Sequence, residues 1–343
     1  MQFCVPNNME AEEVFSEPKD PEIVISDGFD RWLLRNKISL AFTEKLRGKI
    51  YCVGIAGNQG AVSVTKVPVP GASALYSDGR KLWFSSNNHL HGFLKIPTEK
   101  GSRFAPIMTI ATGPRGIEAI ELDPEGRPVY VAAKDNALAT VDFSSPFKKI
   151  WQPIFVAKDE PNDCCHLSGM ALDGNEVRYV TSFSDTSTRL GWESNFNKAG
   201  KVIDITDDRV VSSGLTLPCS PVLYRNSVWL LNSGTSEFGY VDIKSGEFSS
   251  VFRTPGYPTA LAFFENYAFI TLSTSIAGIK PPSEDFSDDL QPSGLIVYNL
   301  DKACIVHWIR LGFESAEVNS IALLPDTPMP ISIPMRSQNS PVV

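Results

Sequence analysis

The amino-acid sequence predicts an all-β protein, a single closed β-propeller of about six four-stranded blades. A strand-turn-strand unit recurs along the whole chain, and the spacing of its copies is roughly 40 to 60 residues, as in propeller blades. An inner strand near the C-terminus has no strand after it, and it complements outer strands near the N-terminus. The 25 Pro and 24 Gly among 343 residues favour many turns over long helices.

The repeated unit has a short apolar strand, a turn, a second apolar strand that ends in small polar residues, and a third strand that closes on an aliphatic residue and Asp. Asp and Gly in the turns of the first two copies are typical of hairpins. Five copies are visible: Ala74 to Ile96, Ile117 to Phe143, Ser168 to Ile205, Ser220 to Gly246 and Thr259 to Asp301. Insertions interrupt the third copy at Thr186 to Ala199 and the fifth at Ile276 to Pro292. The second insertion is acidic and rich in Pro, and we expect a surface loop or flap.

The sixth blade combines the two ends of the chain. Val318 to Pro325 is an inner strand with nothing after it, and Ser39 to Val67 contains outer strands with no inner strand before them. Pairing them closes the ring and removes exposed sheet edges. Three regions follow: an N-terminal arm with a short helix at 1–38, the propeller at 39–325 and a loosely held tail at 326–343. The helix is expected at Gly28 to Ile38, either on the outside of the ring or over one end.

Charge and composition argue against several functions. The net charge is −8 and no segment interleaves Lys and Arg with aromatic residues, so we expect no nucleic-acid partner. The sequence shows neither an export signal nor an apolar run of about 18 residues, which predicts a cytoplasmic protein that does not enter a membrane. Six scattered cysteines indicate free thiols, although adjacent Cys164 and Cys165 leave a strained vicinal disulfide open. No motif points to a cofactor or a metal, and the oligomeric state is left open.

Polar groups in a propeller converge from separate blades, at the starts of the inner strands and in the loops beside them. His166, one of four histidines, precedes an inner strand; it could move a proton, or it could bond backbone between blades. Glu118 could be a general base or the ion-pair partner of Arg115. The remaining members of this predicted ring at the channel mouth are Ser168, Cys219, Ser220, Tyr257, Thr259 and Asn319.

The loop from Thr181 to Trp192, between the second and third strands of the third copy, is rich in Ser and Thr and contains Arg189 and Trp192. It is long enough to reach over the channel, where stacking and a guanidinium hydrogen bond could clamp a flat ligand. Alternatively, Trp192 anchors the loop. Phe183, at the start of the same stretch, completes the predicted substrate-binding residues.

Four motifs resemble those of a conserved propeller family of otherwise uncharacterised proteins: CHLSGMAL from Cys165, TSFSDTSTRLGW from Thr181, LPCSPVLYRNSVWLLNSG from Leu217, and PGYPTALAF from Pro255. The likeness runs from about Asp30 to Pro325. The chain departs from that family at the channel, where His166 alone is retained. Glu118 and Ala119 replace a His-Asp pair, Cys219 replaces a His, and Val222 and Thr259 replace basic residues.

These departures make the channel mouth more neutral and apolar, which suits a hydrophobic organic ligand. The chain is similar to fungal hetero-Diels-Alderases of tropolone sesquiterpenoid biosynthesis. That resemblance implies a cofactor-independent pericyclase of secondary metabolism that joins a tropolone-type quinone methide to a humulene-type sesquiterpene, giving a meroterpenoid. We expect Arg115, Arg189 or His166 to donate a hydrogen bond to the diene oxygen, and Glu118 or His166 to assist loss of water.

Two other functions compete with this hypothesis. A non-catalytic propeller scaffold would show an exposed apolar patch on one face and a channel plugged by side chains, whereas the enzyme needs an open pocket large enough for a terpene. A lactonase-like metal hydrolase needs carboxylate and Asn ligands in the channel, and Glu118 and Asn319 are too few. We therefore expect no metal.

Overall fold

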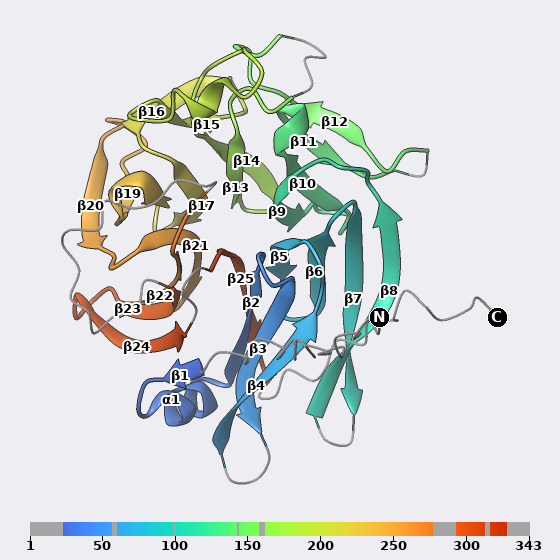
Figure 1. Ribbon diagram of the computed structural model, residues 1–343, viewed down its shortest axis with the longest axis vertical. Helices are drawn as coiled ribbons and strands as arrows, with labels where there is room; N and C mark the ends of the chain where they lie inside the picture. The colour runs from blue at the N-terminus through green and yellow to red at the C-terminus, as the bar shows by residue number, and fades with distance from the viewer. Residues whose placement is uncertain are drawn as a thin grey trace, which may run out of the picture.

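The computed structural model describes residues 23–56, 60–98, 101–142, 144–157, 162–276, 293–312 and 316–327. Within these residues, six antiparallel sheets surround a common axis (Figure 1). Neighbouring inner strands contact one another all the way round, from β25 through β5, β9, β13, β17 and β21 back to β25. The prediction of a closed, all-β propeller with six four-stranded blades is confirmed.

Each blade is numbered here in ring order, and its strands are given from the channel outward. Blade 1 contains β25 (Val318–Pro325), β2 (Ile38–Glu44), β3 (Lys49–Ala56) and β4 (Ala61–Pro68). Blade 2 contains β5 (Ala72–Ser77), β6 (Lys81–Ser86), β7 (His89–Thr98) and β8 (Gly101–Ala111). Blade 3 contains β9 (Ile117–Leu122), β10 (Pro128–Ala132), β11 (Ala137–Thr140) and β12 (Lys148–Trp151).

The second half of the ring follows the same order. Blade 4 contains β13 (Leu167–Asp173), β14 (Glu176–Ser182), β15 (Gly200–Asp204) and β16 (Arg209–Leu215). Blade 5 contains β17 (Pro218–Tyr224), β18 (Ser227–Asn232), β19 (Glu237–Val241) and β20 (Phe248–Arg253). Blade 6 contains β21 (Tyr257–Phe264), β22 (Tyr267–Ser273), β23 (Gly294–Asn299), β24 (Cys304–Leu311) and the added outer strand β1 (Ile23–Ile25). Three short 3-10 helices are η1 (Ala133–Asp135), η2 (Gly191–Glu193) and η3 (Ser233–Thr235).

The hairpins form where Asp and Gly stand between apolar strands. In the β5–β6 turn, Asp78 Oδ1 accepts hydrogen bonds from the backbone N–H groups of Arg80 and Lys81, at 2.8 and 2.6 Å. Gly79 takes a φ of 82°, which side chains disfavour and glycine adopts readily. This local chemistry turns the chain without tertiary help, so the turns were predictable from the sequence.

The hydrophobic core is divided into six clusters, each lying mainly between two adjacent blades. Val131 and Leu138 of blade 3 pack with Leu167 and Val180 of blade 4, for example. Because every blade buries both faces against its neighbours, no blade has a core of its own. The inner-strand starts are therefore held in a rigid ring.

The two ends of the chain close the ring in blade 1, as predicted. β2 pairs antiparallel with β25, with Leu40 opposite Leu323 and Phe42 opposite Ile321. In Figure 1 the blue β2 and the red β25 lie together, although they come from opposite ends of the sequence. Closure places Glu317 and Asn319, late in the chain, beside residues from the first blade.

The segment expected as an N-terminal arm supplies a strand and a helix that pack on the outside of the ring. β1 pairs with β24, and α1 (Phe29–Asn36) packs across blades 6 and 1. Phe29 stacks on His307 at 5.0 Å between ring centroids, and Trp32 meets Tyr267 edge-on at 5.0 Å. Of the two predicted positions for the helix, the outside of the ring is correct. Among the described residues, no helix is long and apolar enough to cross a membrane.

Candidate functional site

A cavity of about 80 Å³ lies at the end of the channel where the inner strands begin. Five blades contribute residues to this cavity, and blade 2 does not. In each of the five, these residues lie at the start of the inner strand or at the end of the strand beside it. The lining residues are Lys45, Glu118, His166, Ser168, Phe183, Cys219, Thr259, Ser273, Ser275, Ile276, Glu317 and Asn319. Seven of them were predicted from the sequence: Glu118, His166, Ser168, Phe183, Cys219, Thr259 and Asn319.

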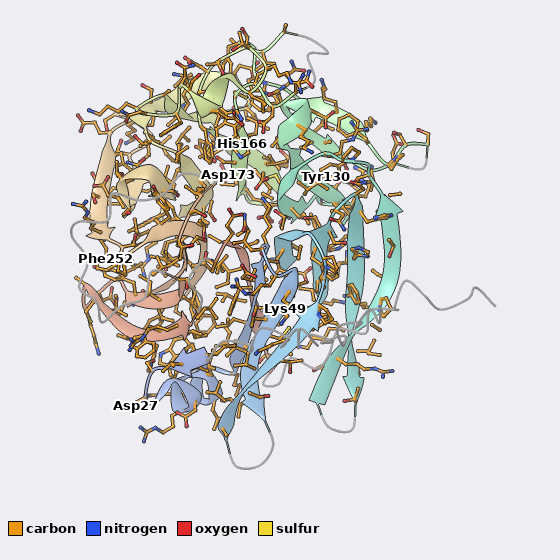
Figure 2. All side chains as sticks on the ribbon, viewed as in Figure 1. Asp27, Lys49, Tyr130, His166, Asp173 and Phe252 are labelled. Carbon is orange, nitrogen blue, oxygen red and sulfur yellow. The ribbon has the colours of Figure 1, made fainter. Side chains whose placement is uncertain are left out.

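His166 (labelled in Figure 2) is held in place by Asp163 and two aromatic rings. It directly precedes β13 and has a left-handed backbone, with a φ of 50°. Its Nδ1 lies 2.8 Å from Asp163 Oδ2. Phe183 and Trp192 contact the imidazole, each with 4.5 Å between ring centroids. An ionised Asp163 accepts a hydrogen bond from Nδ1–H, which leaves Nε2 as the exchangeable nitrogen.

The charge of the imidazole depends on opposing effects. Burial by itself would lower the pKa of His166. The hydrogen bond to Asp163 and the negative charges of Asp163 and Glu118 outweigh burial, against a small opposing effect of Lys45, and the net result is a raised pKa. His166 is therefore charged over a wider pH range than a free histidine, which suits a group that gives a proton away.

The rest of the cavity wall is mostly neutral and hydrogen-bonded. Thr259 Oγ1 lies 3.0 Å from Thr271 Oγ1, and Ser168 Oγ donates to the Pro218 carbonyl at 2.6 Å. The Cys219 thiol contacts Ser233 Oγ at 3.0 Å, and burial raises its pKa to about 12, so the sulfur stays protonated and is no nucleophile at neutral pH. Asn319 Oδ1 is buried and has no hydrogen-bond partner among the residues that the structure describes.

The channel continues below this cavity as a second space of about 100 Å³, lined by all six inner strands. Glu118 and Glu121 of β9 both line it, together with Asn319. Burial raises the pKa of Glu121 to about 8, so this carboxyl group is largely protonated at neutral pH. A neutral carboxyl below the cavity reduces the negative charge around Glu118.

Arg115 and Arg189 lie outside the cavity, in a cleft between blades 3 and 4 that we call the Arg189 cleft. It has a volume of about 450 Å³ and is lined by Pro114, Arg115, Lys134, Asp135, Asn162, Asp163, Arg189 and Leu190. The alternative that Arg115 pairs with Glu118 is wrong, because its guanidinium binds Asp135 at 2.8 Å and covers the Phe147 ring at 4.1 Å. Asp163 belongs to both places, since it binds His166 and lines the cleft.

Two further predicted residues, Trp192 and Tyr257, are not among the residues that line the cavity. Trp192 is 5% exposed and packs on His166 and Phe183, which agrees with an anchoring role. Tyr257 is 1% exposed, and its hydroxyl pKa is raised to about 12 by burial. The expected flap at Ile276 to Pro292 and the tail fall mostly in residues 277–292 and 328–343, outside the described residues.

Three residues in or beside the candidate site escaped the sequence reasoning. Asp163 stands three residues before His166, a spacing that a tight turn converts into a contact, and this signal was available. Lys45 and Glu317, whose charged groups lie 3.9 Å apart, reach the cavity only because β2 and β25 close the ring. No local pattern marks them.

The five described cysteines are free thiols, in agreement with the prediction, and Cys164 and Cys165 do not form a vicinal disulfide. The backbone N–H groups of both residues donate to Asn136 Oδ1, at 2.6 and 3.3 Å. No group of three or more His, Cys, Asp or Glu side chains in the described part of the chain is arranged to hold a metal ion.

A family model matches residues 27–333, nearly the full length of this chain. The chain belongs to the family described as Domain of unknown function (DUF4915). This result confirms the resemblance to an uncharacterised propeller family and leaves its chemistry open. No curated protein matches this DUF4915 chain.

Solved structures resemble the DUF4915 chain in fold. A nidogen/laminin complex matches with a TM-score of 0.54 at 11% identity, over 84% of this chain and 99% of that one. A protein of unknown function from Bacteroides caccae matches with a TM-score of 0.52 at 11% identity, over 84% and 98%. Virginiamycin B lyase from Staphylococcus aureus gives 0.43 at 14% identity, over 84% and 94%. At 11% identity, the first two matches show the shared propeller architecture alone.

Proposed function

We propose that the protein is an enzyme of secondary metabolism that acts at the channel mouth, with His166 as the group that donates a hydrogen bond or moves a proton. One observation supports this function above the others. His166 lines the cavity while Asp163 holds its Nδ1 at 2.8 Å, and Glu118 lines the same cavity. A histidine oriented by a carboxylate and open on its other side is the usual arrangement for general acid-base catalysis.

For this site we propose the intermolecular hetero-Diels-Alder reaction that the family resemblance implies. In the first step a tropolone-type alcohol loses water: protonated His166 gives a proton to the leaving hydroxyl, and Glu118 accepts the proton of the ring hydroxyl. The product is a quinone methide, and a proton passed from Glu118 to His166 restores the starting site. The carbonyl oxygen and exocyclic carbon then add across a terpene alkene, forming one C–O and one C–C bond without further proton transfer.

During cycloaddition the enzyme supplies mainly orientation, which can lower the barrier by about 7 kcal/mol or more in well-ordered cases. A hydrogen bond from His166 to the diene oxygen makes the diene more electron-poor. We assign this role to His166 because Arg115 and Arg189 line the neighbouring cleft. The cavity of about 80 Å³ is smaller than the terpene-sized pocket expected for this function, and it accepts only the reacting end of such a substrate. The terpene would therefore extend outward from the mouth.

The test is a turnover assay with purified protein kept in a chelator, mixed with a tropolone-type alcohol and a humulene-type alkene. We expect a cycloadduct of one configuration, formed faster than in the protein-free mixture. A racemic product at the protein-free rate would contradict the proposal.

A binding scaffold is the second candidate, and an apolar groove between blades 2 and 3 favours it. The groove has a volume of about 460 Å³ and includes Trp83, Met108, Ile110 and Val141, and Met108 is 48% exposed. A scaffold function predicts that wild-type protein gives the product profile of buffer. It also predicts that a Met108→Lys variant loses a partner that wild-type protein retains in co-purification.

A further inference from the structure

Lys45 lies at the mouth of the channel on a backbone that is fixed from both sides. It directly follows β2, its N–H donates to the Glu317 carbonyl at 2.9 Å, and its own carbonyl accepts from the N–H of Gly48 at 3.2 Å. Next to it, the fully buried carboxylate of Glu44 accepts hydrogen bonds from the N–H groups of Glu317 and Arg47, at 3.2 and 2.8 Å. Ring closure therefore places the base of the Lys45 side chain before any ligand binds.

The ion pair of Lys45 with Glu317 is too loose to explain why a lysine lines this cavity. Its Nζ lies 3.9 Å from Glu317 Oε2, which is too far for a hydrogen bond, and the Lys45 side chain is 45% exposed. Ion pairs with this exposure contribute little to stability. Glu317 also has a second partner, because Ser275 Oγ donates to its Oε1 at 3.4 Å. The three N–H donors of Lys45 are therefore not used by Glu317.

The charges around the cavity give Lys45 a distinct place. Besides the Cys219 thiol, the ionisable side chains that line it are Lys45, Glu118, His166 and Glu317. Lys45 acts on the imidazole itself, since its positive charge opposes the raised pKa of His166. With His166 protonated, the two cations and the two carboxylates balance. Once His166 has given a proton to a leaving hydroxyl, Lys45 is the cation that this lining retains.

We propose that Lys45 is a catalytic residue of this site, which binds the ring oxygen of an acidic cyclic enol and stabilises that oxygen as an anion. This inference rests on the reaction proposed above and specifies its substrate: a ring hydroxyl that ionises readily, as in the tropolone class. Glu118 takes the hydroxyl proton, so the O–H bond breaks and its electron pair stays on the ring oxygen beside the Lys45 ammonium group. This pair then forms the carbonyl bond, the ring double bond shifts to the exocyclic carbon, and the leaving hydroxyl departs as water with the proton of His166.

A cation is needed at this oxygen because the substrate ionises beside a carboxylate. Glu118 becomes neutral as it takes the proton, whereas Glu317 keeps its negative charge at the same cavity. Without Lys45 the enolate would meet that charge uncompensated, and it would form less readily. The same oxygen becomes the carbonyl oxygen of the diene, so Lys45 also helps to keep the diene electron-poor during cycloaddition. A substrate with a methylated ring hydroxyl has no proton for Glu118 and should not react.

Tropolone alone, without an alkene, tests the binding step, because its absorption spectrum differs between the neutral and the ionised form. Spectra of tropolone with the full chain are recorded from about pH 5 to pH 8. Wild-type protein should bind the anion at least about tenfold more tightly than the neutral form, because an opposite charge within about 4–6 Å lowers a pKa by about 1–3. Lys45→Met should bind the anion at least about tenfold more weakly than wild-type protein and keep its affinity for the neutral form. Lys45→Arg should retain most of the affinity for the anion.

The control is Lys244→Met, which changes an exposed lysine of blade 5 and should leave the binding of tropolone unchanged. Equal affinity of wild-type protein and Lys45→Met for the anion, or no binding of tropolone, would overturn the proposal. In NMR titrations without ligand, Lys45→Met should raise the pKa of His166, because a nearby positive charge is removed. An unchanged pKa would contradict the proximity of the two groups.

Turnover separates the role of Lys45 from the reaction itself. Lys45→Met should lower kcat for the cycloadduct at least about tenfold, and Lys45→Arg should recover most of it. An unchanged kcat in Lys45→Met would overturn the catalytic role of Lys45 and leave the reaction in place. Binding of the tropolone anion that depends on Lys45, without any cycloadduct, would instead overturn the reaction and support the anion site.

Discussion

At the scale of single residues, the site depends on how His166 is held. Asp163 fixes the imidazole through Nδ1, and Phe183 and Trp192 fix the plane of its ring. Two of these supports, Phe183 and Trp192, were predicted as ligand contacts, and the structure shows them in contact with His166. Their contacts with the imidazole indicate that they position His166.

The raised pKa of His166 predicts how stability depends on pH. The folded protein binds the imidazole proton more tightly than the unfolded chain, whose pKa is near 6.5. The extra stability is complete below about pH 6.5, and it is lost as pH rises through the higher pKa of the folded state. The difference in free energy of unfolding between wild-type protein and His166→Gln should therefore shrink from pH 5.5 to pH 8.5. Urea titrations at both pH values measure it, with His89→Gln as the control. A difference that grows with pH would contradict the assignment.

Cysteine reactivity provides a second test at this scale. Cys304 is exposed, while Cys52 and Cys219 are buried and have pKa values raised to about 12. Because the thiolate is the reactive form, iodoacetamide at pH 8 should modify Cys304 at least about 100-fold faster than Cys52 or Cys219. Peptide mass spectrometry of timed samples measures the rates. Fast labelling of Cys219 in folded protein would show that the cavity wall opens.

At the scale of elements, the sequence predicts the repeated blade strands better than it predicts the short strand β1 that pairs with the outer strand of blade 6. Inner-strand starts were found from the repeat, and the five residues Glu118, His166, Cys219, Thr259 and Asn319 that were placed there line one cavity. The strand β1 was missed because three residues are too short for a visible alternation, and its pairing with β24 is set by tertiary contacts.

Helix α1 gives a matched pair of substitutions. Phe29 is fully buried between the helix and His307, whereas Leu34 of the same helix is 53% exposed. Phe29→Ala should lower the free energy of unfolding by about 3 kcal/mol, since it removes a buried ring and leaves a cavity. Leu34→Ala should change it by less than about 0.5 kcal/mol. Urea unfolding of both variants decides. Equal effects would mean that α1 is not docked on blades 6 and 1.

At the scale of the whole molecule, the pairing of β2 with β25 closes the ring and helps to form the cavity. β2 and β25 bring Lys45, Glu317 and Asn319 to the cavity that His166 enters from blade 4. Residue-level patterns cannot show this, because the contacts join opposite ends of the chain. The repeats do indicate that the two ends of the chain pair, because the inner strand Val318–Pro325 has no outer strands after it. The position of Arg115 and Arg189 outside the cavity was not predictable, because it depends on how loops pack between blades 3 and 4.

The shared cores predict a single cooperative unfolding transition. Each of the six clusters joins adjacent blades, so loss of one blade exposes the cores of two others. Scanning calorimetry should give one transition whose calorimetric and van't Hoff enthalpies agree. Two separate transitions would indicate that part of the ring folds independently.

The measurement that tests the account most directly is the rate of cycloadduct formation by His166→Gln, compared with His89→Gln, an exposed histidine on β7. If His166 is the proton-transferring and hydrogen-bonding group of the channel mouth, its loss should slow the reaction by about 100-fold or more, because general acid-base catalysis contributes effects of that size. His89→Gln should keep the wild-type rate and product configuration. A His166→Gln protein that folds normally and forms the same product at the wild-type rate would contradict the account.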